Sequence, residues 1–119
     1  MVTSNPHTHV PQGYVFVCNR DVIPERGKKT VHIDDRRVLI VATSDGLFAV
    51  EDRCPQTGGS IAHGEVLGTV ITCPTVGARY DLRTGRYVGG GQSPLQSHWL
   101  PVLPLYEADD EIYIRVPTR

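Results

Sequence analysis

The stretch from Cys54 to Gly85 reads CPQTGGSIAHGEVLGTVITCPTVGARYDLRTG. It holds two Cys-Pro pairs, Cys54-Pro55 and Cys73-Pro74, and each pair opens a turn-rich loop that contains glycine. A β-like run, Thr69 to Cys73, leads into the second loop. Such repetition is typical of a metal site in which two paired loops each supply two of the four ligands. Only the two cysteines are evident ligands, so the pattern predicts such a site with half of its ligand set.

Alternating and β-branched residues on both sides of these loops predict antiparallel strands. Ahead of the loops, four runs are expected to form a meander: Tyr14–Cys18, Lys29–Asp34, Arg37–Thr43 and Leu47–Glu51. Behind the loops, two runs are expected to form a C-terminal hairpin that completes the sheet: Pro101–Tyr106 and Glu111–Val116. With 12 Gly, 9 Pro and no long stretch of helical periodicity, the chain is predicted to be all-β.

The length of 119 residues predicts one domain that is large enough to have its own hydrophobic core. Residues 1–12 lack an apolar pattern and are expected to be a flexible tail. Residues 13–119 are expected to form the domain, in which residues from about 52 to 92 are a loop-rich subdomain carried by the sheet. Functional groups tend to lie on loops that a rigid sheet holds in place.

Charge and hydropathy exclude several classes of function. The chain has 12 basic and 13 acidic residues, a net charge of −1, and no basic run, so a nucleic-acid partner is not expected. No transmembrane stretch and no secretory signal is evident, so we expect no membrane association and a cytoplasmic location. Three cysteines without such a signal do not favour a secreted disulfide scaffold.

Several residues outside the two Cys-Pro pairs have plain structural interpretations. Cys18 belongs to an apolar run and is expected to be a buried, inert thiol. Trp99 is the only tryptophan and is expected to anchor packing. Three arginines follow the second loop and are expected to be solvated, with contact to an acidic redox partner as the alternative: Arg79, Arg83 and Arg86.

The two loops share a longer set of residues with one known family: Cys54, Pro55, Gly58, Ile61, Gly64, Cys73, Pro74, Gly77, Tyr80, Asp81, Leu82, Thr84 and Gly85. On these residues the chain resembles the Rieske-type [2Fe–2S] ferredoxin family, and the resemblance extends from about Gly13 to Val116. It implies an antiparallel β-sandwich or barrel with a loop-rich, cluster-binding subdomain inserted.

The resemblance also assigns the ligand positions. The family holds its cluster through two thiolates on one iron and two imidazoles on the other, in a Cys-x-His … Cys-x-x-His pattern. Here Cys54 and Cys73 occupy the Cys positions, but Gln56 and Val76 occupy the His positions. Valine has no lone pair, and an amide oxygen is a hard, weak donor for iron beside sulfide. We therefore expect no cofactor or metal. If the family function is retained, Cys54 and Cys73 would hold a [2Fe–2S] cluster.

Two other histidines lie near the loops, His63 and His98. For His63 to replace an imidazole, a loop whose glycines keep the family spacing would have to be rebuilt. A zinc site made from Cys54, His63, Cys73 and His98 would have none of the short spacings that zinc modules use. Neither arrangement is favoured.

Since both family thiolates bind one iron, the resemblance implies that the sulfurs of Cys54 and Cys73 lie close together. Without iron, that closeness favours a Cys54–Cys73 disulfide or two neighbouring thiols. In the chain-entropy model a bridge closing a loop of this size would add about 3 kcal/mol of stability. A reducing cytoplasm would leave it open.

Three functional hypotheses follow from the resemblance. In the first, the chain is a ferredoxin-like accessory subunit without an intact cluster, with an oxygenase or reductase subunit of a ring-hydroxylating oxygenase or nitrite reductase system as its protein partner. In the second, it is a working [2Fe–2S] electron-transfer ferredoxin with non-standard ligation. In the third, Cys54 and Cys73 form a dithiol/disulfide redox pair, although they lack the C-x-x-C arrangement that activates a thiol. No catalytic constellation is evident, so enzymatic activity of the chain alone is not expected.

Overall fold

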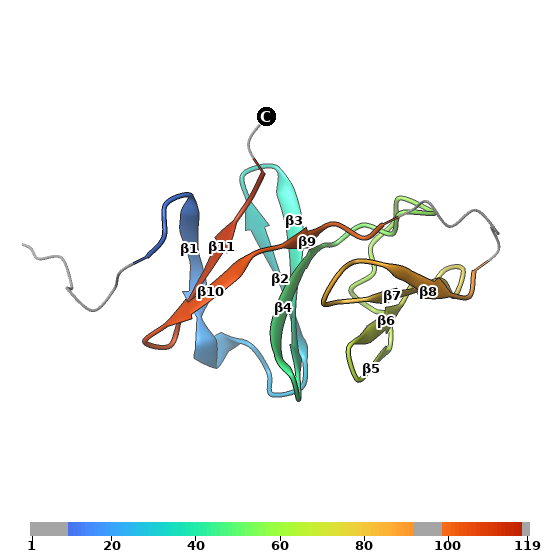
Figure 1. Cartoon of the computed structure of the whole chain (residues 1–119), viewed down its shortest axis with the longest axis horizontal. Coiled ribbons are helices and arrows are strands. Elements are labelled where there is room, and N and C mark those ends of the chain that lie inside the picture. Colours follow the sequence, from blue (N-terminus) through green and yellow to red (C-terminus); the bar gives the residue numbers. More distant parts are fainter. Residues whose placement is uncertain (1–9, 92–98, 118–119) are drawn as a thin grey trace, which may run out of the picture.

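The computed structural model describes residues 10–91 and 99–117. Within them, eleven strands form three antiparallel sheets (Figure 1). The first sheet has the order β1-β11-β10, the second β2-β3-β4-β9, and the third β5-β6-β7-β8. The strands are β1 (Tyr14–Asn19), β2 (Lys28–Ile33), β3 (Arg36–Thr43), β4 (Gly46–Glu51), β5 (Val66–Leu67), β6 (Val70–Thr72), β7 (Arg79–Asp81), β8 (Tyr87–Gly89), β9 (Val102–Leu103), β10 (Leu105–Ala108) and β11 (Glu111–Arg115). A short 3-10 helix, Arg20–Val22, follows β1.

The sheet β2-β3-β4-β9 lies between the other two and is covered on both faces (Figure 1). Strand β3 shows how both faces are covered, because its side chains point alternately into two hydrophobic cores. Leu39 and Val41 pack toward the sheet β5-β6-β7-β8 and the cysteines. Val38 and Ile40 pack with Ile112 and other residues of the sheet β1-β11-β10. A strand buried on both faces has a continuous apolar sequence, as residues 38–42 within the predicted run from Arg37 to Thr43 do.

The prediction of an all-β fold with antiparallel sheets is confirmed, but the expected four-strand meander is wrong in one strand. Strand β1 leaves the meander and pairs with β11, with Phe16 opposite Tyr113. Of the four strands expected to form the meander, β2, β3 and β4 do pair in sequence order. The apolar pattern of β1 identifies a strand, but it carries no information about which distant strand completes its hydrogen bonds.

The predicted strand Pro101–Tyr106 is two strands in different sheets. β9 pairs with β4, whereas β10 pairs with β11. Pro104 lies between β9 and β10, and its lack of an N–H group interrupts the ladder there. The C-terminal hairpin therefore completes the sheet with β1, and the chain passes from one sheet to the other at this proline.

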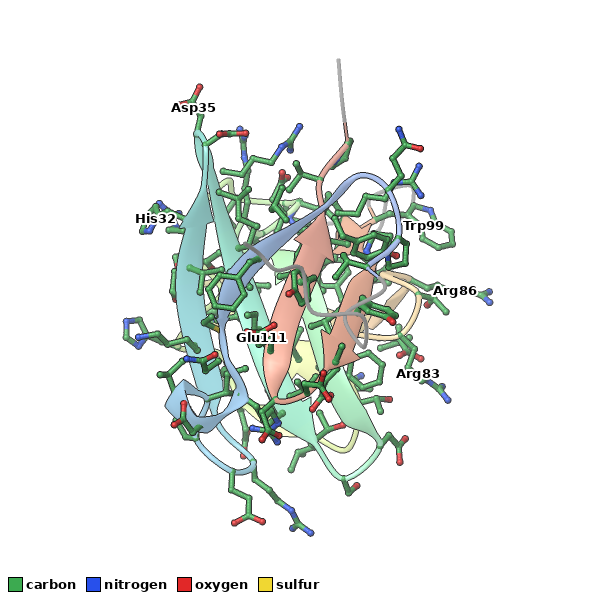
Figure 2. The ribbon with its side chains drawn as sticks, turned by 90° about the vertical axis from the view of Figure 1, so that its left-hand side faces the viewer. His32, Asp35, Arg83, Arg86, Trp99 and Glu111 are labelled. Carbon is green, nitrogen blue, oxygen red and sulfur yellow. The ribbon has the colours of Figure 1, made fainter. Side chains whose placement is uncertain are left out.

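Two packing expectations also need correction. Trp99 is 56% exposed, so it does not anchor the core, and Figure 2 shows it pointing outward. Cys18 is half-buried rather than buried. Burial is nevertheless the main cause that raises the pKa of the Cys18 thiol. An unreactive thiol is consistent with that raised pKa.

No helix within residues 10–91 and 99–117 is long and apolar enough to cross a membrane. The predicted tail, residues 1–12, lies mostly outside the described residues, and so does His98. The proposed division into a domain at 13–119 and a subdomain at about 52–92 stays a prediction. The sheet β5-β6-β7-β8 falls inside that second range.

Candidate functional site

The two Cys-Pro pairs open loops that are closed by the same hydrogen bonds. In the first loop, residues 54–59, the Cys54 N–H donates to Gly59 O at 2.7 Å, and the Gly58 N–H donates to Cys54 O at 2.8 Å. In the second loop, residues 73–78, Cys73 N–H donates to Ala78 O at 2.7 Å, and Gly77 N–H donates to Cys73 O at 2.9 Å.

Gly58 and Gly77 occupy equivalent places in the two loops, with φ of +79° and +82°. Only glycine adopts that conformation readily. The repetition seen in the sequence is therefore a repetition of backbone geometry.

The two loops bring Cys54 and Cys73 together. Each is 1% exposed, and both belong to the core that packs on Leu39 and Val41. The Cys73 thiol donates a hydrogen bond to the Cys54 sulfur. The predicted closeness of the sulfurs is thus present in the structure. All three cysteines of the chain lie in the described part, and all are free thiols. The Cys54–Cys73 disulfide stays a prediction.

The first loop also surrounds the Cys54 sulfur with hydrogen-bond donors. The Thr57 hydroxyl and the backbone N–H groups of Gln56 and Thr57 all donate to it. Burial acts to raise the pKa of the Cys54 thiol, but these bonds and the one from Cys73 outweigh it and lower the pKa below its ordinary value. The loop therefore favours a thiolate at Cys54.

Gln56 and Val76 do not offer donors comparable to imidazole. Val76 is half-buried and packs against the same core as the two cysteines. The amide oxygen of Gln56 faces Gly91, since a Cβ added to Gly91 would lie 3.0 Å from it. The amide nitrogen of Gln56 is buried and has no hydrogen-bond partner among residues 10–91 and 99–117.

Tyr80 holds a second buried polar atom without a partner in the described part of the chain, its hydroxyl oxygen. Tyr80 is fully buried beside the two cysteines. Burial, and then the nearby Cys54, raise the pKa of the Tyr80 hydroxyl to about 12. The Gln56 amide lies near the Tyr80 hydroxyl and acts to lower this pKa, but its nitrogen and the Tyr80 oxygen do not meet in hydrogen-bonding geometry. The Gln56 amide nitrogen and the Tyr80 hydroxyl, two polar groups without a hydrogen-bond partner in the described residues, therefore lie beside the two thiols.

His63 does not join the two thiols. It is exposed and lines a surface pocket with Lys28, Val41 and other residues near the β2 and β3 strand ends, and neither Cys54 nor Cys73 lines that pocket. Within the described residues, no group of three or more His, Cys, Asp or Glu side chains could hold a metal ion. The zinc arrangement was not favoured from the sequence, and its other member, His98, lies outside the described part.

Asp52 fixes the first loop, and the sequence did not point to it. Its side chain is buried and accepts hydrogen bonds from the Ile61 N–H at 2.7 Å and the Ser60 hydroxyl at 2.9 Å. Arg37 Nε donates to the other carboxylate oxygen at 2.9 Å. The carboxylate thus ties both ends of residues 52–61 to the sheet. A single Asp two residues before a Cys carries no recognisable signal of this role.

At Gly64 and at Gly90, two backbone segments lie too close together to admit a side chain. A Cβ on Gly64 would lie 1.9 Å from Thr72 O, and a Cβ on Gly90 would lie 2.2 Å from Gly77 O. The first contact joins the segment after the first loop to β6. The second brings residues 89–91 against the second loop.

A family model of the Rieske-like [2Fe-2S] domain matches residues 13–115. The chain belongs to this family. The 3-phenylpropionate/cinnamic acid dioxygenase ferredoxin subunit of Photorhabdus laumondii is 30% identical over 104 residues, which cover 86% of this chain and 93% of that protein.

Solved structures with the same fold include the terminal oxygenase of carbazole 1,9a-dioxygenase from Novosphingobium sp. KA1, with a TM-score of 0.79 and 20% identity. That match covers 89% of this Rieske-like chain but only 30% of the oxygenase chain. A chain of the complex of reduced oxygenase and oxidized ferredoxin in carbazole 1,9a-dioxygenase has a TM-score of 0.73 and 23% identity, over 88% of this chain and 94% of that chain.

The residues of this Rieske-like domain do not fit the family's cluster as a complete ligand set. The two thiols fit one iron, and the donors at Gln56 and Tyr80 suit sulfur acceptors. At the other iron, however, the alkyl group of Val76 packs on the core and the Gln56 oxygen faces Gly91. Neither side chain replaces an imidazole.

Proposed function

We propose that this chain is a ferredoxin-like component of a ring-hydroxylating oxygenase system, located in the cytoplasm, and that it binds a protein partner without carrying a Rieske cluster. The observation that carries the proposal is the pair Gln56 and Val76 at the two His positions, in two loops that are closed by the same pattern of backbone hydrogen bonds. In this proposal the two loops serve as a binding surface for the partner, although two of the four cluster-ligand positions no longer hold a ligand.

The partner is proposed to be an oxygenase or reductase subunit. Support comes from the dioxygenase ferredoxin subunit that this chain matches over nearly its whole length. The exposed tips of the two loops, Thr57–Gly59 and Pro74–Thr75, are available for contact. Three exposed arginines follow the second loop, and Figure 2 shows Arg83 and Arg86 pointing outward. A nitrite reductase system is the alternative partner within the same proposal.

The test is the iron and acid-labile sulfide content of protein purified without oxygen, together with its visible spectrum. The expected result is neither iron nor a Rieske spectrum. The matched variant, Gln56→His with Val76→His, restores both imidazoles and is expected to bind a cluster if the loops keep their geometry. Two irons per chain in the unmodified protein would overturn the proposal.

One observation favours a second candidate, an electron-transfer ferredoxin with non-standard ligation. The unpartnered donors at Gln56 and Tyr80 would be satisfied by a bound group that carries acceptor atoms. The same iron and sulfide measurement separates the two candidates, because only this second one requires both elements in the unmodified protein.

The contact between the Cys54 and Cys73 thiols favours a third candidate, a dithiol/disulfide redox pair. Thiol counting under denaturing, non-reducing conditions tests it. Three free thiols in freshly isolated protein would remove it, whereas a single free thiol at Cys18 would support it.

A further inference from the structure

We propose that the cleft between β5 and the adjoining ends of β2 and β3 binds a small organic carboxylate, an anion with an apolar body. The cleft has a volume of about 510 Å³ and lies between the central sheet and residues 63–68 (Figure 1). Neither Cys54 nor Cys73 lines it. The inference therefore goes beyond the proposed function and is independent of whether a cluster is bound.

Basic side chains supply the part of the cleft that suits an anion. Arg26, Lys28 and His63 line it, and Glu65 is the only acidic residue among the described lining residues. Lys28 is half-buried, and its Nζ donates to Gly64 O, a neutral acceptor. Burial lowers the pKa of Lys28 below its ordinary value. A carboxylate beside this ammonium would compensate the cost of burying its charge.

Lys28 forms no ion pair with any Asp or Glu of the chain. All 13 acidic residues lie within residues 10–91 and 99–117, where the structure describes them. Their ion pairs are with other cations: Arg20, Arg36, Arg37 and Arg83. A half-buried ammonium is attracted to an anion more strongly than one in open water, and hydrogen bonds between charged groups are the strong ones. The missing counter-charge therefore favours an anionic ligand.

The remaining lining suits an apolar body. Val41 and Val66 contribute alkyl groups, and Leu67 is 70% exposed at the same cleft. Covering an exposed leucine with an apolar ligand group is favourable. Small-molecule sites typically have a volume of about 300–1,000 Å³, apolar walls and a few placed polar groups. A carboxylate on an aliphatic or aromatic body matches both parts of this lining.

Backbone hydrogen bonds hold both walls of the cleft in place. On one wall, the Thr72 N–H donates to Glu65 O at 2.9 Å. On the other, the Ala42 N–H donates to Gly27 O at 2.8 Å. The Lys28 side chain bridges the two walls. A ligand would thus enter a formed cleft and would not have to order its walls, which reduces the cost of binding.

The experiment uses the full chain, labelled with ¹⁵N, and follows its backbone amide resonances by NMR during titration with benzoate. Benzamide has nearly the same shape without the charge, and inorganic phosphate is an anion without the apolar body. We expect saturable shifts at Gly27, Gly64 and Leu67 with benzoate, and binding at least about tenfold weaker with either control. These titrations use the unmodified protein, so they do not depend on the folding of a variant.

Three variants test the basic groups. Lys28→Met keeps an apolar stem and removes the ammonium, so benzoate affinity should fall at least about tenfold. Arg26 has a φ of +56°, a conformation that Asn tolerates, and Arg26→Asn should weaken binding about two- to fivefold. Lys29→Met is the matched control. Lys29 follows Lys28 in β2, points to the opposite face and does not line the cleft, so its replacement should leave affinity unchanged.

The outcomes distinguish failure of this inference from failure of the proposed function. Absence of benzoate binding, shifts confined to other surfaces, or unchanged affinity in Lys28→Met would overturn the inference and leave the accessory role standing. Benzamide or phosphate binding as tight as benzoate would also overturn it, since the charge or the apolar body would then be irrelevant. Iron and sulfide in the isolated protein would overturn the proposed function alone.

Discussion

Asp52→Ala is the substitution expected to destabilise the first loop most directly. The carboxylate is 2% exposed and accepts the Ile61 N–H at 2.7 Å. Ile61 is fully buried, so its N–H group would lose its acceptor without gaining water. Such an unsatisfied buried group costs about 1–3 kcal/mol. Ser60 is half-buried and can be rehydrated, so it adds little.

The ion pair with Arg37 should contribute less than the bond from Ile61. The Arg37 side chain is 48% exposed, and exposed pairs are worth about 0–1 kcal/mol. We therefore expect a loss of about 2 kcal/mol for Asp52→Ala and less than about 1 kcal/mol for Arg37→Ala. For a chain of this size, a loss of about 2 kcal/mol lowers Tm by roughly 8 °C.

Urea unfolding followed by far-ultraviolet circular dichroism measures both losses of stability. An unchanged m-value, the slope of unfolding free energy against urea concentration, confirms that the transitions are comparable. Asp52→Ala should also increase the rate at which Cys54 is alkylated, because the loop that buries it opens more often. Equal losses for Asp52→Ala and Arg37→Ala would refute the reasoning, since the surface ion pair would then outweigh the buried hydrogen bond.

Three further predictions concern single contacts. Gly64→Ala places a Cβ 1.9 Å from Thr72 O and should cost about 1–3 kcal/mol in urea unfolding, whereas Gly59→Ala, whose Cβ has its nearest neighbour at 3.6 Å, should be nearly neutral. A hydrogen bond from Arg83 lowers the pKa of the Asp81 carboxyl in the folded chain. The ionised carboxylate therefore stabilises the fold above the unfolded pKa of about 3.9, and this stabilisation is lost as pH falls through the lower folded pKa. Asp81→Asn should flatten the pH dependence of stability in that acidic window, and an unaltered profile would contradict this. Tyr80→Phe should be neutral or stabilise the metal-free protein by about 1 kcal/mol, because it removes an unpartnered buried hydroxyl, and clear destabilisation would show that the hydroxyl has an acceptor.

The longer strands could be predicted from the sequence because their own side chains specify them. β3 and β4 combine β-branched residues with an Asp-Gly turn between them, and both form as expected. Strands β5, β7 and β8 were missed. They have two or three residues each, too few to show a period, and they depend on pairings such as Ile71 with Tyr80. Such short strands are specified by their partners rather than by local preference.

The candidate site, too, could be predicted only in part from the sequence. The motif spacing predicted two equivalent loops and, through the family resemblance, neighbouring sulfurs at Cys54 and Cys73. It did not predict Asp52 as the residue that fixes the first loop, nor the approach of Gly91 to Gln56. Both depend on contacts between segments whose relative positions only the folded chain determines.

Iron and acid-labile sulfide per chain, measured with the visible spectrum on protein isolated anaerobically, test the central claim most directly. Gln56 and Val76 at the His positions predict that no Rieske cluster is present: no stoichiometric iron, no labile sulfide and no Rieske absorption. Two irons and two sulfides per chain with a Rieske spectrum would contradict the account.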